Sequence, residues 1–215
     1  MSGILFTSQA WGNFGLNIGD EDEIVLARRD DLRKSASVKK MIFMNQTHSD
    51  RVSFVSSEND IVEGDAIITT EKSLGLAVLV GDCVPVLIKS DIAVAAIHAG
   101  RVGMVNGIAT KAIRAMKEIG AKNFEAILGP SICEDCYEVS PQMYEDVIIS
   151  VPDSATTHDV HRLNLQAGIA SQITALGIEV LNLGICSRES LDFYSHRRSQ
   201  EKGEPQGRQV GLIYL

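Results

Sequence analysis

Residues 74–100 have the sequence LGLAVLVGDCVPVLIKSDIAVAAIHAG, and this stretch decides the fold. It contains three short aliphatic runs bounded by Gly, Asp or Ser, a pattern typical of buried β-strands, at residues 74–80, 84–88 and 92–97. A compact Lys-Ser-Asp turn at residues 89–91 joins the last two runs, so we expect them to pair as a hairpin. Because Cys83 precedes one arm and His98 ends the other, this hairpin would bring both side chains to one edge of a sheet.

The same strand pattern continues on both sides of this stretch, together with helical patterns. Strands are expected at residues 4–6, 41–43, 52–55, 66–69, 124–128, 178–183 and 209–215. A helix is expected over residues 103–120, because its apolar residues recur at helical spacing along one stripe. Further helices are expected over residues 20–35, 142–149, 163–176 and 187–191. The sequence shows no repeat, linker or second domain, which predicts one domain over residues 1–215.

The composition is typical of a globular enzyme. The chain has 215 residues and a mass of 23.3 kDa, with 45% hydrophobic and 22% charged residues, enough for one well-buried domain. A formal net charge of -8 argues against non-specific nucleic-acid binding, so an anionic substrate would need a local cluster of donors. We expect neither a signal peptide nor a membrane span. Four cysteines do not suggest a disulfide scaffold, so we expect a cytoplasmic protein with reduced thiols.

Three potential metal ligands lie at or near the ends of predicted strands: His48, Cys83 and His98. Three protein ligands and one open position make a catalytic zinc site. The ligands are 35 and 15 residues apart, which indicates a site assembled from different strands rather than a zinc finger. Two other interpretations stay open: a buried cysteine with two hydrogen-bonded histidines, or a Cys83 nucleophile with His98 as its base. Asp82, next to the cysteine, can orient a histidine, act as a base or cap a turn.

Other polar groups are less specific. Cys133 and Cys136 form a C-x-x-C pair that lacks the second pair of a zinc knuckle, so we interpret them as structural thiols. Three arginines follow the aromatic pair at residues 193–194, namely Arg197, Arg198 and, further along, Arg208. The fork geometry of arginine suits phosphate or carboxylate groups, although a charged surface patch would also explain any one of them.

Eight short motifs together resemble one known family. They are Asn-Gln-Thr-His-Ser at 45–49, Gly-Asp-Ala-Ile-Ile-Thr at 64–69, Gly-Asp-Cys-Val-Pro-Val at 81–86, Ile-His-Ala-Gly at 97–100, Gly-Pro-Ser-Ile at 129–132, Cys-Tyr-Glu-Val at 136–139, Phe-Tyr-Ser-His-Arg-Arg at 193–198 and Gly-Arg at 207–208. Spread over nearly the whole chain, they resemble the laccase-domain (YfiH-like) family. That family was first labelled polyphenol oxidase and is now regarded as one of purine nucleoside phosphorylases.

The resemblance implies a fold, a metal and an activity. The implied fold is α+β, a compact single-domain sandwich of mixed β-sheets flanked by helices. The implied cofactor is one zinc ion, bound by the residues that match His48, Cys83 and His98. The implied activity is phosphorolysis of adenosine, inosine, guanosine and methylthioadenosine, with adenosine deamination at the same site. Purine nucleosides and phosphate would then be the partners of a monomer or weak homo-oligomer, with no nucleic acid and no membrane.

Three further residues are expected to serve this chemistry. Arg29 matches the arginine of an Asn-Arg pair in the first helix of the family, which makes it a candidate substrate contact. Arg29 and Arg198, with the backbone of residues 100–103, are expected to hold phosphate or ribose. Asp82 is expected to shuttle protons during deamination, in which zinc would activate water.

The chain departs from the family pattern at the turn after His98. The family usually continues His-Ala-Gly with Trp-Arg-Gly, whereas this chain has Arg101-Val102-Gly103. Arg101 would therefore have to replace the arginine missing at Val102 from a shifted direction.

Two other activities stay open: a cysteine hydrolase acting on cell-wall precursors through Cys83 and a copper-dependent polyphenol oxidase. Five histidines are too few for a blue-type multicopper centre.

Overall fold

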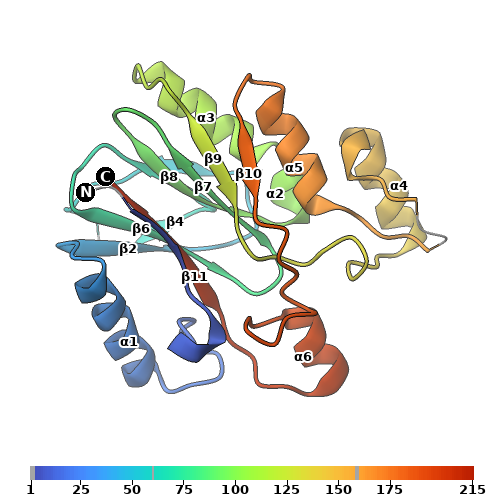
Figure 1. Ribbon diagram of the computed structural model, residues 1–215, viewed down its shortest axis with the longest axis horizontal. Coiled ribbons are helices and arrows are strands. Elements are labelled where there is room, and N and C mark those ends of the chain that lie inside the picture. Colours follow the sequence, from blue (N-terminus) through green and yellow to red (C-terminus); the bar gives the residue numbers. More distant parts are fainter. Residues whose placement is uncertain (1–2, 60, 158–159) are drawn as a thin grey trace.

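Two β-sheets pack face to face in this computed structural model, which describes residues 3–59, 61–157 and 160–215 (Figure 1). The five-stranded sheet has the order β1 (Gly3–Phe6), β11 (Gln209–Tyr214), β6 (Leu74–Val80), β2 (Lys40–Asn45) and β4 (Val62–Glu63). The six-stranded sheet has the order β10 (Val180–Asn182), β9 (Glu125–Leu128), β7 (Val84–Lys89), β8 (Val94–Ala99), β5 (Ala66–Thr69) and β3 (Val52–Phe54). Both sheets mix parallel and antiparallel pairs, which confirms the predicted α+β sandwich.

Helices cover the outer faces of both sheets (Figure 1). In the described part of the chain the α-helices are α1 (Asp22–Ser35), α2 (Arg101–Val105), α3 (Ile108–Glu118), α4 (Pro141–Ser150), α5 (Leu165–Thr174) and α6 (His196–Lys202). Helix α1 packs on the five-stranded sheet, where Leu32 joins a cluster with Val210 and Leu212. Helices α3 and α5 bury their apolar faces against the six-stranded sheet. None of the described helices is long and apolar enough to cross a membrane.

The chain crosses from one sheet to the other at Gly81, Asp82 and Cys83. Strand β6 pairs with β11 and β2 in the five-stranded sheet, whereas β7 pairs with β8 and β9 in the six-stranded sheet. Asp82 has a φ of 104°, a conformation that non-glycine residues rarely adopt and that makes this corner sharp. The predicted hairpin is confirmed, because β7 and β8 are antiparallel with Pro85 opposite His98.

The alternation of side chains along β8 decides where His98 points. Ala95, Ile97 and Ala99 belong to the core between the sheet and the helices. Val94 and Ala96 belong to the core between the two sheets. Because strand side chains alternate with a period of two, His98 continues the second row. The histidine therefore lies at the end of the layer between the two sheets.

Two predicted helices differ in the structure. The helix expected over residues 103–120 is divided into α2 and α3 by Gly107, whose φ of 70° is left-handed. Glycine adopts this conformation without steric cost, so the chain can turn here while the predicted apolar stripe stays buried along α3. Residues 187–191 form turns instead of the expected short helix. Their backbone is held by other segments, as where Ser187 donates its N–H to Ser131.

Candidate active site and metal centre

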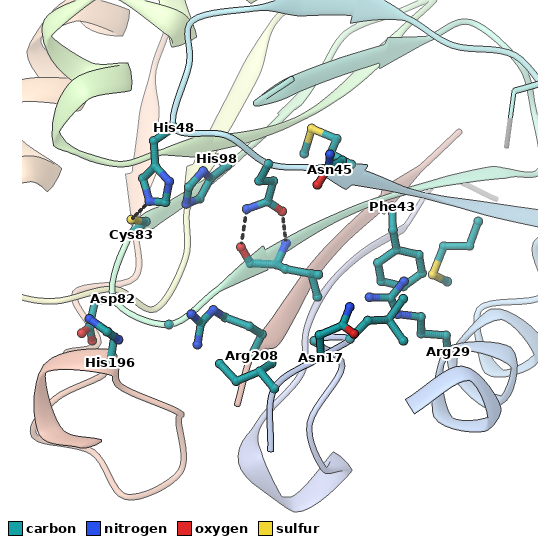
Figure 2. Close-up of a pocket in the computed structure, with 18 of the residues that line it drawn as sticks. Asn17, Arg29, Phe43, Asn45, His48, Asp82, Cys83, His98, His196 and Arg208 are labelled. Carbon is teal, nitrogen blue, oxygen red and sulfur yellow. Dashed lines mark hydrogen bonds between the residues drawn. The ribbon is translucent and has the colours of Figure 1, made fainter. Parts of the chain in front are cut away.

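A cavity of about 1140 Å³ opens at the end of the layer between the sheets. Its wall includes His48, which follows β2, Cys83, which precedes β7, and His98, near the end of β8. Figure 2 shows these three side chains together at one end of the cavity, with Arg29 and Phe43 at the other. The volume is sufficient for a small-molecule substrate of nucleoside size.

The three predicted ligands lie within reach of a single ion. Cys83 Sγ is 3.8 Å from His48 Nε2, and the two histidine rings are edge to face with centroids 4.7 Å apart. One ligand atom from each residue lies within 4.8 Å of the others. Zinc bound at its usual distances in a tetrahedral site separates its ligand atoms by about 3.3–3.8 Å, so this donor set fits one zinc ion after small side-chain shifts. That these residues bind zinc stays a prediction.

Gly100 makes room for this cluster. A Cβ atom at this position would lie 3.0 Å from Cys83 Sγ and 3.2 Å from the Cδ2 atom of His48. Any side chain here would therefore push the cysteine or the histidine away from the cluster. The glycine of the His-Ala-Gly motif thus has a steric role beside its role as the residue before α2.

Asp65 orients this site, and sequence reasoning did not select it. It is fully buried, and its Oδ1 lies 2.7 Å from Nδ1 of His98. The same carboxylate accepts hydrogen bonds from the backbone N–H groups of Thr47, His48 and Ser49. One side chain therefore fixes the ring of His98 and the loop that carries His48. The orienting role considered for Asp82 belongs to Asp65, and the only sequence signal was its place in the motif at residues 64–69.

The charges of the cluster support one another in the metal-free protein. Burial alone would raise the pKa of Cys83, but the neighbouring His98 and His48 lower it to about 6. Burial alone would lower the pKa of His98, but Cys83 and Asp65 together raise it to about 9. Burial likewise disfavours the Asp65 carboxylate, yet hydrogen bonds from His98 and Ser49 hold its pKa well below the usual range. The result near neutral pH is a thiolate beside an imidazolium ion.

Asp82 lies on the cavity wall but is not bonded to the three predicted ligands. Its Oδ1 accepts a hydrogen bond of 2.7 Å from Ser187 Oγ, and its Oδ2 accepts one of 2.7 Å from the backbone N–H of Arg197. A carboxylate at the N-terminus of a helix complements the helix dipole, and Asp82 reaches this end of α6 from outside the helix. Asp82 therefore joins the corner between the sheets to the N-terminus of α6.

Arg198 is not among the residues that line the cavity, so the structure gives no support to its predicted contact with phosphate or ribose. Only 3% of this residue is exposed, and its side chain pairs with Glu204 at 2.5 Å. Its two Nη atoms donate to backbone carbonyls of the segment before α6, at Ser187, Arg188, Ser190 and Phe193. The guanidinium group is thus directed into the protein, where it holds this irregular segment together.

Four other arginines do line the cavity, namely Arg29, Arg33, Arg197 and Arg208, and two of them lie along its length between Phe43 and the ligand cluster. Arg29 donates from Nε and Nη2 to the carbonyl of Phe14, and its guanidinium carbon is 3.9 Å from the centre of the Phe43 ring. Burial lowers its pKa to about 10. Arg208 lies between Arg29 and the ligand cluster in Figure 2 and donates from Nη1 to the carbonyl of Gly207 at 2.7 Å. Burial lowers the pKa of Arg208, against the opposing charges of Cys83 and Asp82.

The turn that departs from the family pattern lies beside the cavity. Arg101 is the first residue of α2 and is close enough to Tyr137, which lines the cavity, to interact with its hydroxyl. Burial raises the pKa of Tyr137, and Arg101 opposes this rise. Val102 is 36% exposed, so its aliphatic side chain lies at the surface. Arg101 therefore reaches the cavity through Tyr137 rather than by lining it.

Comparisons with known proteins agree with this architecture. Residues 3–215 match the family described as multi-copper polyphenol oxidoreductase laccase. A Corynebacterium glutamicum protein named purine nucleoside phosphorylase is 36% identical over an alignment of 233 residues, which covers 98% of this chain and 93% of the relative. A Streptomyces coelicolor protein of the same name is 36% identical, over 94% of this chain and 87% of the relative.

Solved structures show the same fold. The crystal structure of the Bacillus licheniformis hypothetical protein YfiH has a TM-score of 0.88 and 24% identity to this chain, covering 99% of this chain and 92% of YfiH. YlmD from Geobacillus stearothermophilus has a TM-score of 0.83 and 23% identity, covering 100% of this chain and 91% of YlmD. With a family match over residues 3–215 and relatives 36% identical, this chain belongs to the multi-copper polyphenol oxidoreductase laccase family.

Proposed function

We propose that this chain is a zinc-dependent purine nucleoside phosphorylase acting on adenosine, inosine, guanosine and methylthioadenosine. The observation that carries the proposal is the cluster of His48, Cys83 and His98, which opens onto the same cavity as Arg208. Relatives that align over nearly the whole chain are named for this activity. In the reaction, a phosphate oxygen forms a bond to C1′ of the ribose while the bond from C1′ to the purine nitrogen breaks.

His48, Cys83 and His98 would hold the zinc ion, which supplies Lewis-acid chemistry when it is bound. The Asp65 carboxylate accepts a hydrogen bond from Nδ1–H of His98, and this leaves Nε2 as the metal-binding nitrogen. Because Asp65 also binds the backbone of His48, two of the three ligands are oriented by one buried carboxylate. Preorganisation of this kind keeps a site from collapsing when its ion leaves.

Arg208 is proposed to bind phosphate, in place of Arg198. A dianion in a chain with a net charge of -8 needs a nearby cation whose donors are not all used within the protein. Arg208 lines the cavity, and the only hydrogen bond that its guanidinium makes to the described residues is the one to Gly207. Arg29 is proposed to contact the substrate at the end of the cavity that holds Phe43.

Adenosine deamination is proposed as a side activity of the same site. Water must add to the purine ring carbon that bears the amino group, and a proton must then reach the leaving ammonia. Asp82 is proposed as the proton shuttle, because it lies on the cavity wall beside Cys83. Its hydrogen bonds to Ser187 and to the N-terminus of α6 would fix the carboxylate in one position.

An assay of adenosine turnover with and without phosphate tests the proposal. We expect release of adenine and ribose 1-phosphate only when phosphate is present, and slower formation of inosine that does not need phosphate. Elemental analysis of the same sample distinguishes zinc from copper. Adenine release at equal rates without phosphate would contradict phosphorolysis, and oxidation of a phenol by a copper-loaded sample would favour the polyphenol oxidase.

A second candidate function is hydrolysis with Cys83 as the nucleophile, as in a hydrolase of cell-wall precursors. The observation that favours it is the lowered pKa of Cys83 beside the His98–Asp65 pair, which resembles an activated cysteine with its base and orienting acid. The two functions differ in their response to chelation. A hydrolase would keep its activity after complete removal of metal and lose it in Cys83→Ser, whereas the phosphorylase would lose it in both cases.

A further inference from the structure

A second group of potential metal ligands lies outside the cavity described above. It consists of the thiols of Cys133, Cys136 and Cys186 and the carboxylate of Glu189, and we call it the thiol cluster. One ligand atom from each of the four lies within 4.8 Å of the others. Cys136 and Cys186 are buried, Cys133 is half-buried, and Glu189 is exposed at the surface. All three cysteines are free thiols.

Two turns present these four side chains. In the first, Cys136 donates its backbone N–H to the carbonyl of Cys133, and in the second, Ser190 donates to the carbonyl of Cys186. Each turn places residues i and i+3 on the same side, giving a C-x-x-C pair and a C-x-x-E pair. The segments that lead into the turns are bonded to each other, because Ser131 forms a parallel bridge with Cys186.

We propose that the thiol cluster is a structural zinc site, with ligands Cys133, Cys136, Cys186 and Glu189. Structural zinc is almost always four-coordinate and tetrahedral, and cysteine thiolates and carboxylates are among its usual ligands. A tetrahedral ion with bonds of about 2.3 Å to sulfur separates two thiolates by about 3.8 Å, within the spread of this cluster. The second pair that the C-x-x-C motif lacks in sequence is thus supplied in space by the turn after β10.

The surroundings of the cluster suit an anionic metal–thiolate group. Arg188 donates from Nη1 to Sγ of Cys136 at 3.4 Å, and its other nitrogens bind Glu201. Hydrogen bonds from cationic groups stabilise metal-bound thiolates and set their orientation. A disulfide would use only two of the three thiols, and it would leave both the third thiol and the approach of Glu189 without an explanation.

The proposed zinc would act on the cavity through Asp82. Ile132, next to Cys133, donates its backbone N–H to the carbonyl of Asp82 at 2.9 Å. Ser187, next to Cys186, donates its hydroxyl to the carboxylate of the same residue. Both turns of the cluster therefore hold the corner between the sheets, so an ion that joins them would stabilise one wall of the cavity.

Zinc stoichiometry in variants tests this proposal without reference to turnover. We expect about two tightly bound zinc ions per chain after loading and gel filtration, and about one in the double variant His48→Ala/Cys83→Ser. The cobalt form of that double variant should show sulfur-to-cobalt charge-transfer bands. Glu189→Gln should lose the remaining ion to a chelator about tenfold faster, whereas Glu145→Gln, an exposed carboxylate on α4, should not.

A measurement on the unmodified protein avoids any variant that fails to fold. Alkylation followed by peptide mapping should show Cys133, Cys136 and Cys186 protected in the zinc-loaded protein and labelled after chelation. Three results would overturn the proposal. They are loss of all zinc from the double variant, labelling of these thiols that zinc does not change, and a disulfide between two of them that persists in the loaded protein.

Discussion

Replacing Asp65 with asparagine is the most informative perturbation of the candidate site. The substitution keeps the shape of the side chain but removes the charge that faces His98 and the backbone of His48 and Ser49. It also places an amide N–H₂ group among hydrogen-bond donors. Because Asp65 is fully buried, water can neither replace the lost charge nor accept hydrogen bonds from the new amide group.

The size of the effect follows from the contacts. The pKa of His98 is raised from 6.5 to about 9, with Cys83 contributing more to the rise than Asp65. One pH unit corresponds to about 1.36 kcal/mol, so the two partners together outweigh burial by roughly 3 kcal/mol. Asp65 supplies the smaller part of that total, but its carboxylate also accepts hydrogen bonds from the backbone of Thr47, His48 and Ser49. We expect a lower pKa of His98 in metal-free Asp65→Asn and, with these hydrogen bonds weakened as well, a free energy of unfolding reduced by about 2–4 kcal/mol. The affinity for zinc should fall about 10–100-fold, as for other residues that orient metal-bound histidines.

The assays are chelator competition for zinc, NMR titration of the histidine rings and unfolding in urea. Asp50→Asn is a matched control, because Asp50 lies in the same loop and pairs with Lys111 at the surface. An exposed ion pair contributes less than about 1 kcal/mol, so this control should bind zinc as the wild type does. If Asp65→Asn bound zinc with wild-type affinity, Asp65 would not orient the site, and the reasoning would be wrong.

Further predictions concern pH and three other side chains. Zinc needs Cys83 as a thiolate and His98 neutral, and their pKa values in the metal-free protein are about 6 and about 9. Zinc affinity should therefore rise about tenfold per pH unit between these two values, and more steeply below pH 6. A flat pH profile in chelator competition would contradict this. Arg208→Ala should raise the KM for phosphate about tenfold or more with little change in Tm, whereas Arg198→Ala should lower the free energy of unfolding by about 3–5 kcal/mol. Steady-state kinetics and urea unfolding should show this contrast. The reverse pattern would mean that Arg198, and not Arg208, contacts phosphate. Asp82→Ala should destabilise the protein by about 0.5–2 kcal/mol, because it removes the hydrogen bond to the N-terminus of α6. It should also slow deamination more than phosphorolysis. Equal slowing of the two reactions would contradict the role of Asp82 as proton shuttle.

The central hairpin could be predicted because its determinants are local. The aliphatic runs and the turn at residues 89–91 placed Cys83 and His98 at one edge, as the structure confirms. The division of the helix over residues 103–120 could not be predicted from its apolar stripe. The stripe persists through α3, and only the backbone conformation of Gly107 shows where the direction changes.

The partners of buried charges could not be predicted, because contacts over long sequence separations decide them. Asp65 and His98 meet because β5 and β8 are neighbours in the six-stranded sheet. Arg198 was expected to hold phosphate or ribose because of its residue type and motif. The sequence does not show that backbone carbonyls before α6 surround its guanidinium group. Cys186 joins the C-x-x-C pair only through the bridge between its segment and Ser131.

The most direct test of the central claim is a titration of zinc into metal-free protein, with the rate of phosphate-dependent adenine release measured at each step. Cys83→Ser is the companion sample, because it removes one proposed ligand of the cavity and leaves the thiol cluster intact. The account predicts that the wild-type rate rises from near zero and saturates when the site of His48, Cys83 and His98 is filled, with no such rise in Cys83→Ser. A metal-free wild-type protein that releases adenine as fast as the loaded protein would contradict it.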